Sequence, residues 1–401
     1  MTEPIAAQQE AESQLRRFML LYALAWAGGA ISYVPFLTIL LPVRVTDLAG
    51  PQDLDWLSYI AFTGAVAASI GNIFFGWLSD LTRTRKLWIT MGLVLSCLLL
   101  VSVPVAKTLI PLLGIIVLWQ LSLNMMLGPL AAWAGDCVPD HQKGMLGGLM
   151  SIAPALGALS GALVTIPGAA AADQRLWLVV GMVTAAMLPI VIFGNPRPFP
   201  ALTRPIAKSD RPSGLETLRL PTVQRMWLAR LLVQIAEAAL FAFLYFWLRS
   251  IAPDFGDNRT AGLFTVVLAA SIPIAMIAGR WADRVGRPIL PLAFFAFITA
   301  VGLSGMGLAA SLTAAIAGYV IFGIAGTAFL ALHAAQTLRF LPSPQNRGRD
   351  LGIFNLTNTI PSLIMPWLTL GLVPIFGFSG LFFLLAGLAL IASVLLFSIS
   401  R

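Results

Sequence analysis

The chain has 401 residues, of which 58% are hydrophobic and only 10% are charged. Soluble domains carry about 25% charged residues, so this composition excludes a soluble protein and predicts an integral membrane protein. The formal net charge of +8 does not indicate nucleic-acid binding, because the basic residues lie in short segments beside long apolar runs.

Apolar runs of membrane-spanning length recur along the chain and predict an all-α membrane protein with twelve transmembrane helices. The expected spans are residues 18–43, 57–79, 88–106, 109–135, 145–170, 176–194, 226–248, 261–282, 289–310, 312–337, 351–375 and 378–400. Because the number of spans is even, both termini are expected on the same side of the membrane.

Lysine and arginine are distributed unequally over the segments between these spans. The segments on the side of the termini hold 18 of the 25 basic residues, the loops on the opposite side hold five, and Arg230 and Arg280 fall within spans. Cytoplasmic loops of membrane proteins are enriched in basic residues, so the bias predicts that both termini lie in the cytoplasm, with the protein in the cell (inner) membrane.

The chain repeats a loop motif at almost half its length. The segment that begins at Gly76 and contains Asp80 returns at Gly279 with Asp283, 203 positions later (279 − 76). Such a repeat predicts two similar bundles of six helices. A stretch rich in proline and basic residues lies between the halves and predicts a linker loop. The expected domains are an N-terminal bundle in 1–194, a cytoplasmic linker in 195–225 and a C-terminal bundle in 226–401.

The twelve spans, the repeat and the paired loop motifs resemble the major facilitator superfamily of secondary transporters. The loop signature of that superfamily is Gly-x-x-x-Asp-Arg-x-Gly-Arg-Arg/Lys, and the second copy matches it at Gly279, Asp283, Arg284, Gly286 and Arg287. The resemblance implies two pseudo-symmetric six-helix bundles around a central cavity that opens alternately to the two sides of the membrane.

The first copy of the motif departs from this signature. Leu81 replaces the first arginine, and the run from Asp80 to Lys86 looks instead like the Asp-Arg-Thr-Arg-Thr-Arg variant of sugar:cation symporters. Pro361 and the asparagines of the eleventh span are also similar to that branch, which contains the glycoside–pentoside–hexuronide and sucrose transporters.

The charged residues of both loops are candidates for a gate at the cytoplasmic side. Asp80 can accept hydrogen bonds from a neighbouring helix N-terminus, and the arginines can pair with an acid such as Asp136. Contacts of this kind bias the conformational equilibrium when they exist in only one state. The alternative is a tight turn with solvated charges. The expected gating residues are Gly76, Asp80, Arg83, Arg85, Asp136, Gly279, Asp283, Arg284, Gly286 and Arg287.

The seventh span carries polar residues on one helical face. Arg230, Gln234 and Glu237 are spaced four and three positions apart, and Tyr245 continues the same stripe. Glu237 lies about 16 Å from the cytoplasmic end of the span, near the middle of the bilayer, which makes it the candidate for proton or cation coupling. As alternatives, Glu237 is a structural partner of Arg230 or Gln234, and Arg230 snorkels to the interface.

Other polar and aromatic residues within the spans are candidates for contact with a solute. Gln120 and Asn124 share a face of the fourth span beside Trp119, and His333 lies near the cytoplasmic end of the tenth, where it can be solvated. Spans 1, 4, 7 and 10 line the cavity in the superfamily that the chain resembles, although each residue is equally consistent with a helix–helix contact. The remaining candidates are Trp26, Tyr33, Gln336, Asn355 and Asn358.

These features predict a secondary active transporter that moves a small organic solute by alternating access. The first hypothesis is proton- or cation-coupled uptake of a sugar-like solute. The alternatives are a proton antiporter that exports drugs or siderophores, and a siderophore importer. Pro154 and Gly157 match part of the signature of drug:proton antiporters. A receptor or scaffold on the same fold is disfavoured, because it does not need a carboxylate at membrane depth.

The sequence contains no Gly-rich phosphate loop, catalytic triad or cluster of metal ligands. We therefore expect no enzyme activity, no cofactor and no metal. The expected partners are a small-molecule substrate, a coupling proton or cation and the lipid bilayer, without nucleic acid, and the protein is expected to be a monomer.

Overall fold

The computed structural model describes most of the chain, and every regular element in that part is a helix. The described residues are 14–139, 142, 146, 149–150, 152–199, 221–285, 289–340 and 347–399, with backbone alone at 282–285, 334–335, 337–340 and 347–355.

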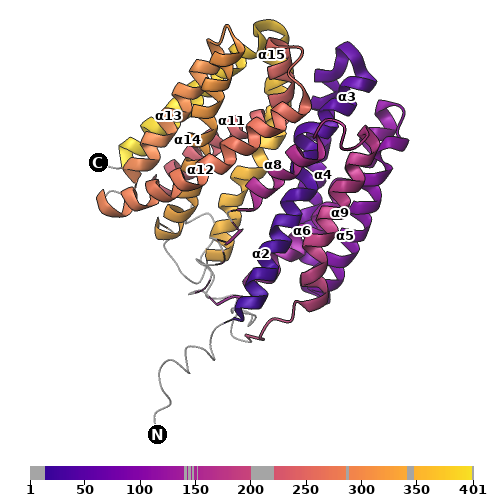
Figure 1. Cartoon of the computed structure of the whole chain (residues 1–401). Coiled ribbons are helices and arrows are strands. Elements are labelled where there is room, and N and C mark those ends of the chain that lie inside the picture. The colour runs from indigo at the N-terminus through magenta and orange to yellow at the C-terminus, as the bar shows by residue number, and fades with distance from the viewer. Residues whose placement is uncertain are drawn as a thin grey trace. The chain divides into compact units, whose positions relative to one another are not determined.

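The helices follow one another along the chain (Figure 1). In the first half they are α2 (Arg16–Pro35), α3 (Leu41–Ala49), α4 (Asp53–Thr82), α5 (Arg85–Ser102), α6 (Leu109–Cys137), α8 (Ala153–Val164) and α9 (Ala172–Phe193). A π-helical turn, Phe36–Leu40, joins α2 to α3. In the second half they are α11 (Pro221–Ile251), α12 (Asp257–Val285), α13 (Ile289–Gly307), α14 (Leu312–Phe340) and α15 (Arg347–Ile399).

The predicted set of twelve spans agrees with these helices. Nine continuous helical stretches of the described chain are long and apolar enough to cross a membrane. Two of these stretches each contain two spans. The first runs from α2 through α3 into α4, and the second is α15, which breaks at Gly377, where φ is +65°. The short apolar helix α8 completes the set. Helices are expected here because a bilayer offers no partners to unpaired backbone groups.

The largest difference from the expected boundaries lies in the fifth span. It was predicted to reach residue 170, but α8 ends at Val164. Pro167 cannot continue the helical hydrogen bonds, and Gly168 has a φ of +76°, so the chain turns there. The expected first part of this span, from residue 145, lies largely outside the described residues.

The contacts between Cα atoms divide the chain into two compact units. The first contains Met1–Phe36 and Thr63–Ile206, and the second contains Leu37–Phe62 and Ala207–Arg401. The second unit therefore includes α3 and the beginning of α4 in addition to α11–α15. The division into bundles at 1–194 and 226–401 remains a prediction.

Each unit is held together by a few extensive helix–helix contacts. In the first unit, α5 packs along α6, and α2 packs against α8 and α9. In the second unit, α11 contacts both α14 and α15, and α13 packs against the same two helices. The core of the second unit contains an edge-to-face contact between Trp247 and Phe382, whose ring centroids are 4.8 Å apart. This packing fixes the face that α11 presents to α14 and α15.

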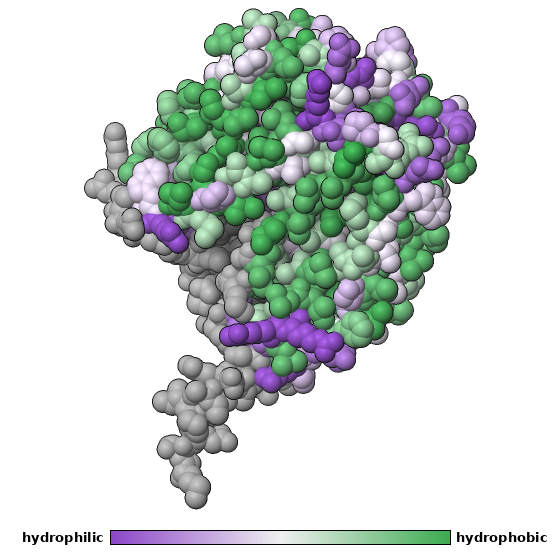
Figure 2. Space-filling view, in the orientation of Figure 1, coloured by the Kyte–Doolittle hydropathy of each residue, from purple (hydrophilic) through white to green (hydrophobic). Residues whose placement is uncertain are grey.

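The surface agrees with a membrane environment. Over the first unit, hydrophobic residues cover the visible face of the helices, and hydrophilic residues gather at the helix ends (Figure 2). Large apolar side chains such as Ile73 and Ile110 are about three-quarters exposed. Apolar exposure of this extent is expected where lipid rather than water surrounds a protein.

A glycine permits the close approach of α5 and α6. A Cβ atom built on Gly92 would lie 2.8 Å from the Cα of Met126. We therefore expect Gly92→Ala to lower the stability of the purified protein by about 1–3 kcal/mol through overpacking. Gly114→Ala is the matched control, because a Cβ there meets nothing within 4 Å. The measurement is thermal unfolding in detergent, and equal melting temperatures for the two variants would contradict the packing argument.

Candidate functional site

Glu237 lies close to the middle of α11. The helix has 31 residues and is about 46 Å long, which exceeds the roughly 30 Å of the hydrocarbon core. Its central residue is Ala236, so Glu237 is placed near mid-bilayer if the helix crosses symmetrically. Among the described residues it is the one carboxyl far from a helix end.

The carboxyl of Glu237 faces Gly326 of α14. A Cβ built on Gly326 would collide with Oε1 of Glu237, so the missing side chain provides the space for the carboxyl. Oε1 is buried and accepts no hydrogen bond from the described residues. A buried oxygen without a donor costs about 1–3 kcal/mol if it stays unsatisfied. The contact therefore holds an acceptor that a proton, water or ligand can satisfy.

The antiparallel register of α11 and α14 places further residues in the same contact. Tyr319, Gly326 and His333 are seven positions apart, so they lie on one face of α14. His333 Nε2 lies 2.9 Å from the carbonyl oxygen of Met226, eleven positions before Glu237. His333 is completely buried, so the expectation that this imidazole is solvated is wrong.

Arg230 is bound to α15 instead of Glu237. Its Nε donates to Thr357 Oγ1 at 3.0 Å, and its Nη2 donates to Asn358 Oδ1 at 3.4 Å. The structure thus brings together two residues that the sequence indicated separately, Arg230 and Asn358. No ion pair joins Arg230 to Glu237, because seven residues along a helix separate their Cα atoms by about 10 Å.

Two glutamines on the same helices also have unpartnered acceptors. Gln234 lies between Arg230 and Glu237 on α11, and Gln336 lies on α14. The Oε1 atoms of both glutamines are buried and accept no hydrogen bond within the described part of the chain. Asn355 is in α15, but its side chain lies outside the described residues.

Tyr245 belongs to a different contact near the far end of α11. Arg249 donates to its hydroxyl at 3.4 Å, and the guanidinium carbon lies 5.3 Å from the centre of the ring. The structure therefore places Tyr245 two turns away from Glu237, in a cation–π pair that accounts for its polar group.

The first unit has its own polar contact between helices. Asn72 Nδ2 donates to Asn124 Oδ1 at 3.3 Å, and Asn124 Nδ2 donates to the backbone oxygen of Gln120 at 2.9 Å. Amide pairs of this kind join membrane helices. Gln120 and Asn124 are both largely buried, and the hydrogen bond from Asn72 to Asn124 joins α4 to α6 within their own unit.

The aromatic candidates of the first unit lie mainly in its interior. Trp119 is fully buried against Phe36, with ring centroids 4.9 Å apart. Trp26 stacks on Tyr22 at 6.4 Å, and Tyr33 is partly buried in α2. Trp119 is therefore explained by core packing, whereas Trp26 and Tyr33 keep some exposed surface.

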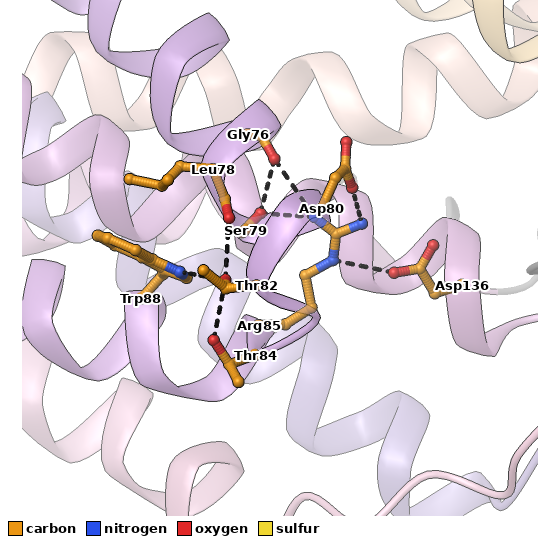
Figure 3. Close-up of polar contacts among 9 residues, drawn as sticks. All are labelled: Gly76, Leu78, Ser79, Asp80, Thr82, Thr84, Arg85, Trp88 and Asp136. Atoms are coloured by element: carbon orange, nitrogen blue, oxygen red, sulfur yellow. Dashed lines mark hydrogen bonds and ion pairs between the residues drawn. The ribbon is translucent and has the colours of Figure 1, made fainter.

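Arg85 is the centre of a polar network at the loop between α4 and α5 (Figure 3). Its guanidinium pairs with Asp80 and with Asp136 at the end of α6, where Nε lies 2.9 Å from Oδ2. It also donates to Ser79 Oγ. The side chain of Arg85 is only 14% exposed, and its charge is neutralised by two carboxylates, of which Asp80 is 63% exposed.

The first glycine of each loop motif has open space beside it in this structure. A Cβ built on Gly76 or on Gly279 meets no described atom within 4 Å. Arg83 is in the left-handed region with a φ of +52°, which ends α4 in a tight turn. In the second copy, the side chains of Asp283 and Arg284, together with Gly286 and Arg287, lie outside the described residues.

The sequence interpretation missed three residues of these contacts: Thr357, Gly326 and Ser79. Thr357 is one position from the predicted Asn358, so the polar face of the eleventh span was a usable signal. Gly326 lies seven positions before His333, but nothing in the sequence alone assigns it to Glu237.

The fold and these sites define an integral membrane protein whose helices carry polar groups at membrane depth. Residues 226–401 match the family model described as Major Facilitator Superfamily. No curated protein sequence matches the chain.

Solved transporters share the fold over nearly the whole chain. The human organic anion transporter MFSD10 (TETRAN) has a TM-score of 0.67 at 15% identity, over 95% of this chain and 99% of that one. A bacterial homolog of the human lysosomal transporter Spinster, inward-facing and occupied, has a TM-score of 0.67 at 14% identity, covering 100% of this chain and 96% of that one. Its unoccupied form has a TM-score of 0.65 at 15% identity, covering 96% of this chain and 94% of that one.

The second part of the chain, residues 226–401, thus matches the major facilitator superfamily by sequence, and the solved transporters show that nearly the whole chain shares their fold. The helices of the described residues are consistent with the twelve-helix architecture of that fold.

The contact between Glu237 and Gly326 can be tested by a double-mutant cycle. We expect Gly326→Ala to lower the melting temperature, because the added Cβ displaces the carboxyl. In the background of Glu237→Ala the same change should cost less, with a coupling energy of about 0.5–3 kcal/mol. Gly371→Ala, where a Cβ meets nothing within 4 Å, is the control. Strictly additive effects would show that the two residues do not touch.

Proposed function

We propose that the protein is a proton-coupled secondary transporter of a small organic solute, in which Glu237 carries the coupling proton. The observation that supports this is the buried Oε1 of Glu237, which has no donor among the described residues and lies near the centre of α11. A carboxyl at membrane depth is costly and is usually functional.

The chemistry follows from the two forms of the carboxyl. The protonated form is neutral and can donate a hydrogen bond to a solute, whereas the ionised form needs water or a donor to offset its desolvation. Conformations that differ in access to Glu237 therefore differ in their affinity for a proton. Exchange of the proton between such conformations couples proton movement to solute movement.

The direction of transport is proposed from the sequence. Uptake of a sugar-like solute remains the first hypothesis, because the amide group of Gln234 suits hydroxylated compounds. Export of drugs or siderophores, and siderophore import, are the alternatives. The partial antiporter signature in α8 gives export no separate support, because a Cβ on Gly157 would lie 2.9 Å from Val34 Cγ2 and the glycine is needed for packing.

Coupling is tested in proteoliposomes with a solute chosen by a thermal-shift screen of sugars, glycosides, siderophores and organic anions. Glu237→Gln keeps the shape of the side chain and removes its titration. We expect it to abolish accumulation against a gradient and solute-dependent proton movement, while exchange across the membrane survives. Asp173→Asn, at the exposed start of α9, is the control for loss of one carboxylate. Concentrative transport with normal pH dependence in Glu237→Gln would place coupling elsewhere.

We also propose that the loop network around Arg85 belongs to a gate at the predicted cytoplasmic side. Asp80→Asn removes one of the two carboxylates that pair with Arg85. We expect lower transport with normal membrane insertion, and altered labelling of cysteine probes placed on the cytoplasmic side. Asp55→Asn, an exposed change at the other end of α4, is the control. Unchanged transport and labelling in Asp80→Asn would leave the network with a structural role only.

A further inference from the structure

The charge of Arg230 is not balanced by any carboxylate in the described part of the chain. Both described ion pairs belong to Arg85, and the hydrogen-bond acceptors of Arg230 are the neutral oxygens of Thr357 and Asn358. An arginine within a span is expensive and is normally paired with an opposite charge or with backbone oxygens. Neutral side-chain partners orient the guanidinium but leave its charge uncompensated.

The guanidinium of Arg230 is held in place and still has donors to offer. Arginine carries five N–H donors in a rigid fork, and Thr357 and Asn358 use one on Nε and one on Nη2. Contacts with two successive residues of α15 restrict the plane of the fork. The remaining donors suit the two oxygens of a carboxylate, which an arginine binds in bidentate geometry.

This group lies on the surface of the second unit rather than in its core. Asn358 is exposed and Arg230 is partly exposed, although Thr357 between the helices is fully buried. Arg230 is also about 7.5 Å deeper along α11 than Arg225, whose guanidinium binds Ser398 near the end of the chain. Polar side chains at membrane depth face a water-filled cavity instead of lipid.

The neighbouring positions on α11 add a second recognition element. Gln234 is one turn from Arg230, and its Oε1 is buried without a described donor. Glu237 follows one turn later with its own unpartnered Oε1. The three residues span about 10 Å along one helix face, which is the length of a small organic molecule.

We propose that Arg230 is an anion-binding residue and that the transported solute is an organic anion. Its carboxylate pairs with the Arg230 guanidinium, and a hydroxyl or amine of the solute donates to Gln234 Oε1. The inference rests on the proposed transport function and names the substrate class of that same site. Under this proposal, the solute is an anionic, hydroxylated compound and not a neutral sugar.

The test uses two pairs of probes that differ in charge but little in shape. Methyl glucuronide is compared with methyl glucoside, and 4-hydroxybenzoate with 4-hydroxybenzamide. Affinity is measured by ligand-induced thermal stabilisation of the purified full-length protein at constant ionic strength. Arg230→Gln removes the charge, and Arg230→Lys keeps the charge without the fork. Arg225→Gln is the matched control, because it removes an arginine five positions away on the same helix.

We expect the anionic probe of at least one pair to bind wild type and Arg225→Gln more tightly than its neutral partner. Arg230→Gln should bind that anion about ten- to a hundred-fold more weakly, as expected for a lost charge-assisted hydrogen bond. The affinity of Arg230→Lys for that anion should lie between those of wild type and Arg230→Gln. This variant serves as the test if Arg230→Gln does not fold. A purely structural role lowers the melting temperature of the unliganded protein but leaves the preference for the anion unchanged.

Two outcomes overturn the inference: no anionic probe binds wild type better than its neutral partner, or the preference persists in Arg230→Gln. Glu237→Gln separates this inference from the coupling proposal. If that variant keeps the anion preference but still accumulates solute, the coupling role fails and the anion site stands. If neutral probes are accumulated with proton movement and Arg230→Gln behaves as wild type, the anion site fails and proton coupling stands.

Discussion

The cost of a polar or charged group inside a membrane is the constraint on which the arrangement around α11 depends. Each polar residue on that helix must find a partner on a neighbouring helix or face water. Arg230 reaches α15, and Glu237 reaches the space left by Gly326 on α14. One helix face thus provides polar contacts to both of the neighbours against which α11 packs.

Most of the fold was predictable because the same constraint acts on the backbone. Apolar runs in a bilayer have to be helical, and their length is set by bilayer thickness. The predicted spans therefore agree with helices such as α6 and α13 within a few residues. The main error, at the end of α8, came from following apolar residues past Pro167 and Gly168, where backbone geometry ends the helix before hydropathy does.

The candidate site was predictable only in part. Helical spacing alone places Arg230, Gln234 and Glu237 on one face of α11, whereas the contact of Arg230 with Asn358 comes from the structure. Which residue contacts which depends on the register between helices, and that register is set by packing. Gly326 carries no chemistry in the sequence, yet its missing side chain leaves the space in which the Glu237 carboxyl lies. Tyr245 shares the helical spacing but pairs with Arg249, because a cation lies one turn away.

The two arginines of these polar clusters illustrate opposite solutions to the same electrostatic problem. Arg85 lies at a loop, where two carboxylates neutralise it, so the network is complete without any ligand. Arg230 lies within a span, where desolvation is more costly, and its described partners are neutral. The network around Arg85 stabilises one conformation of the protein without a ligand. The group around Arg230, in contrast, is stabilised when an anion binds. Arg230, whose described partners are neutral, therefore indicates where contact with an anionic ligand contributes most to its binding.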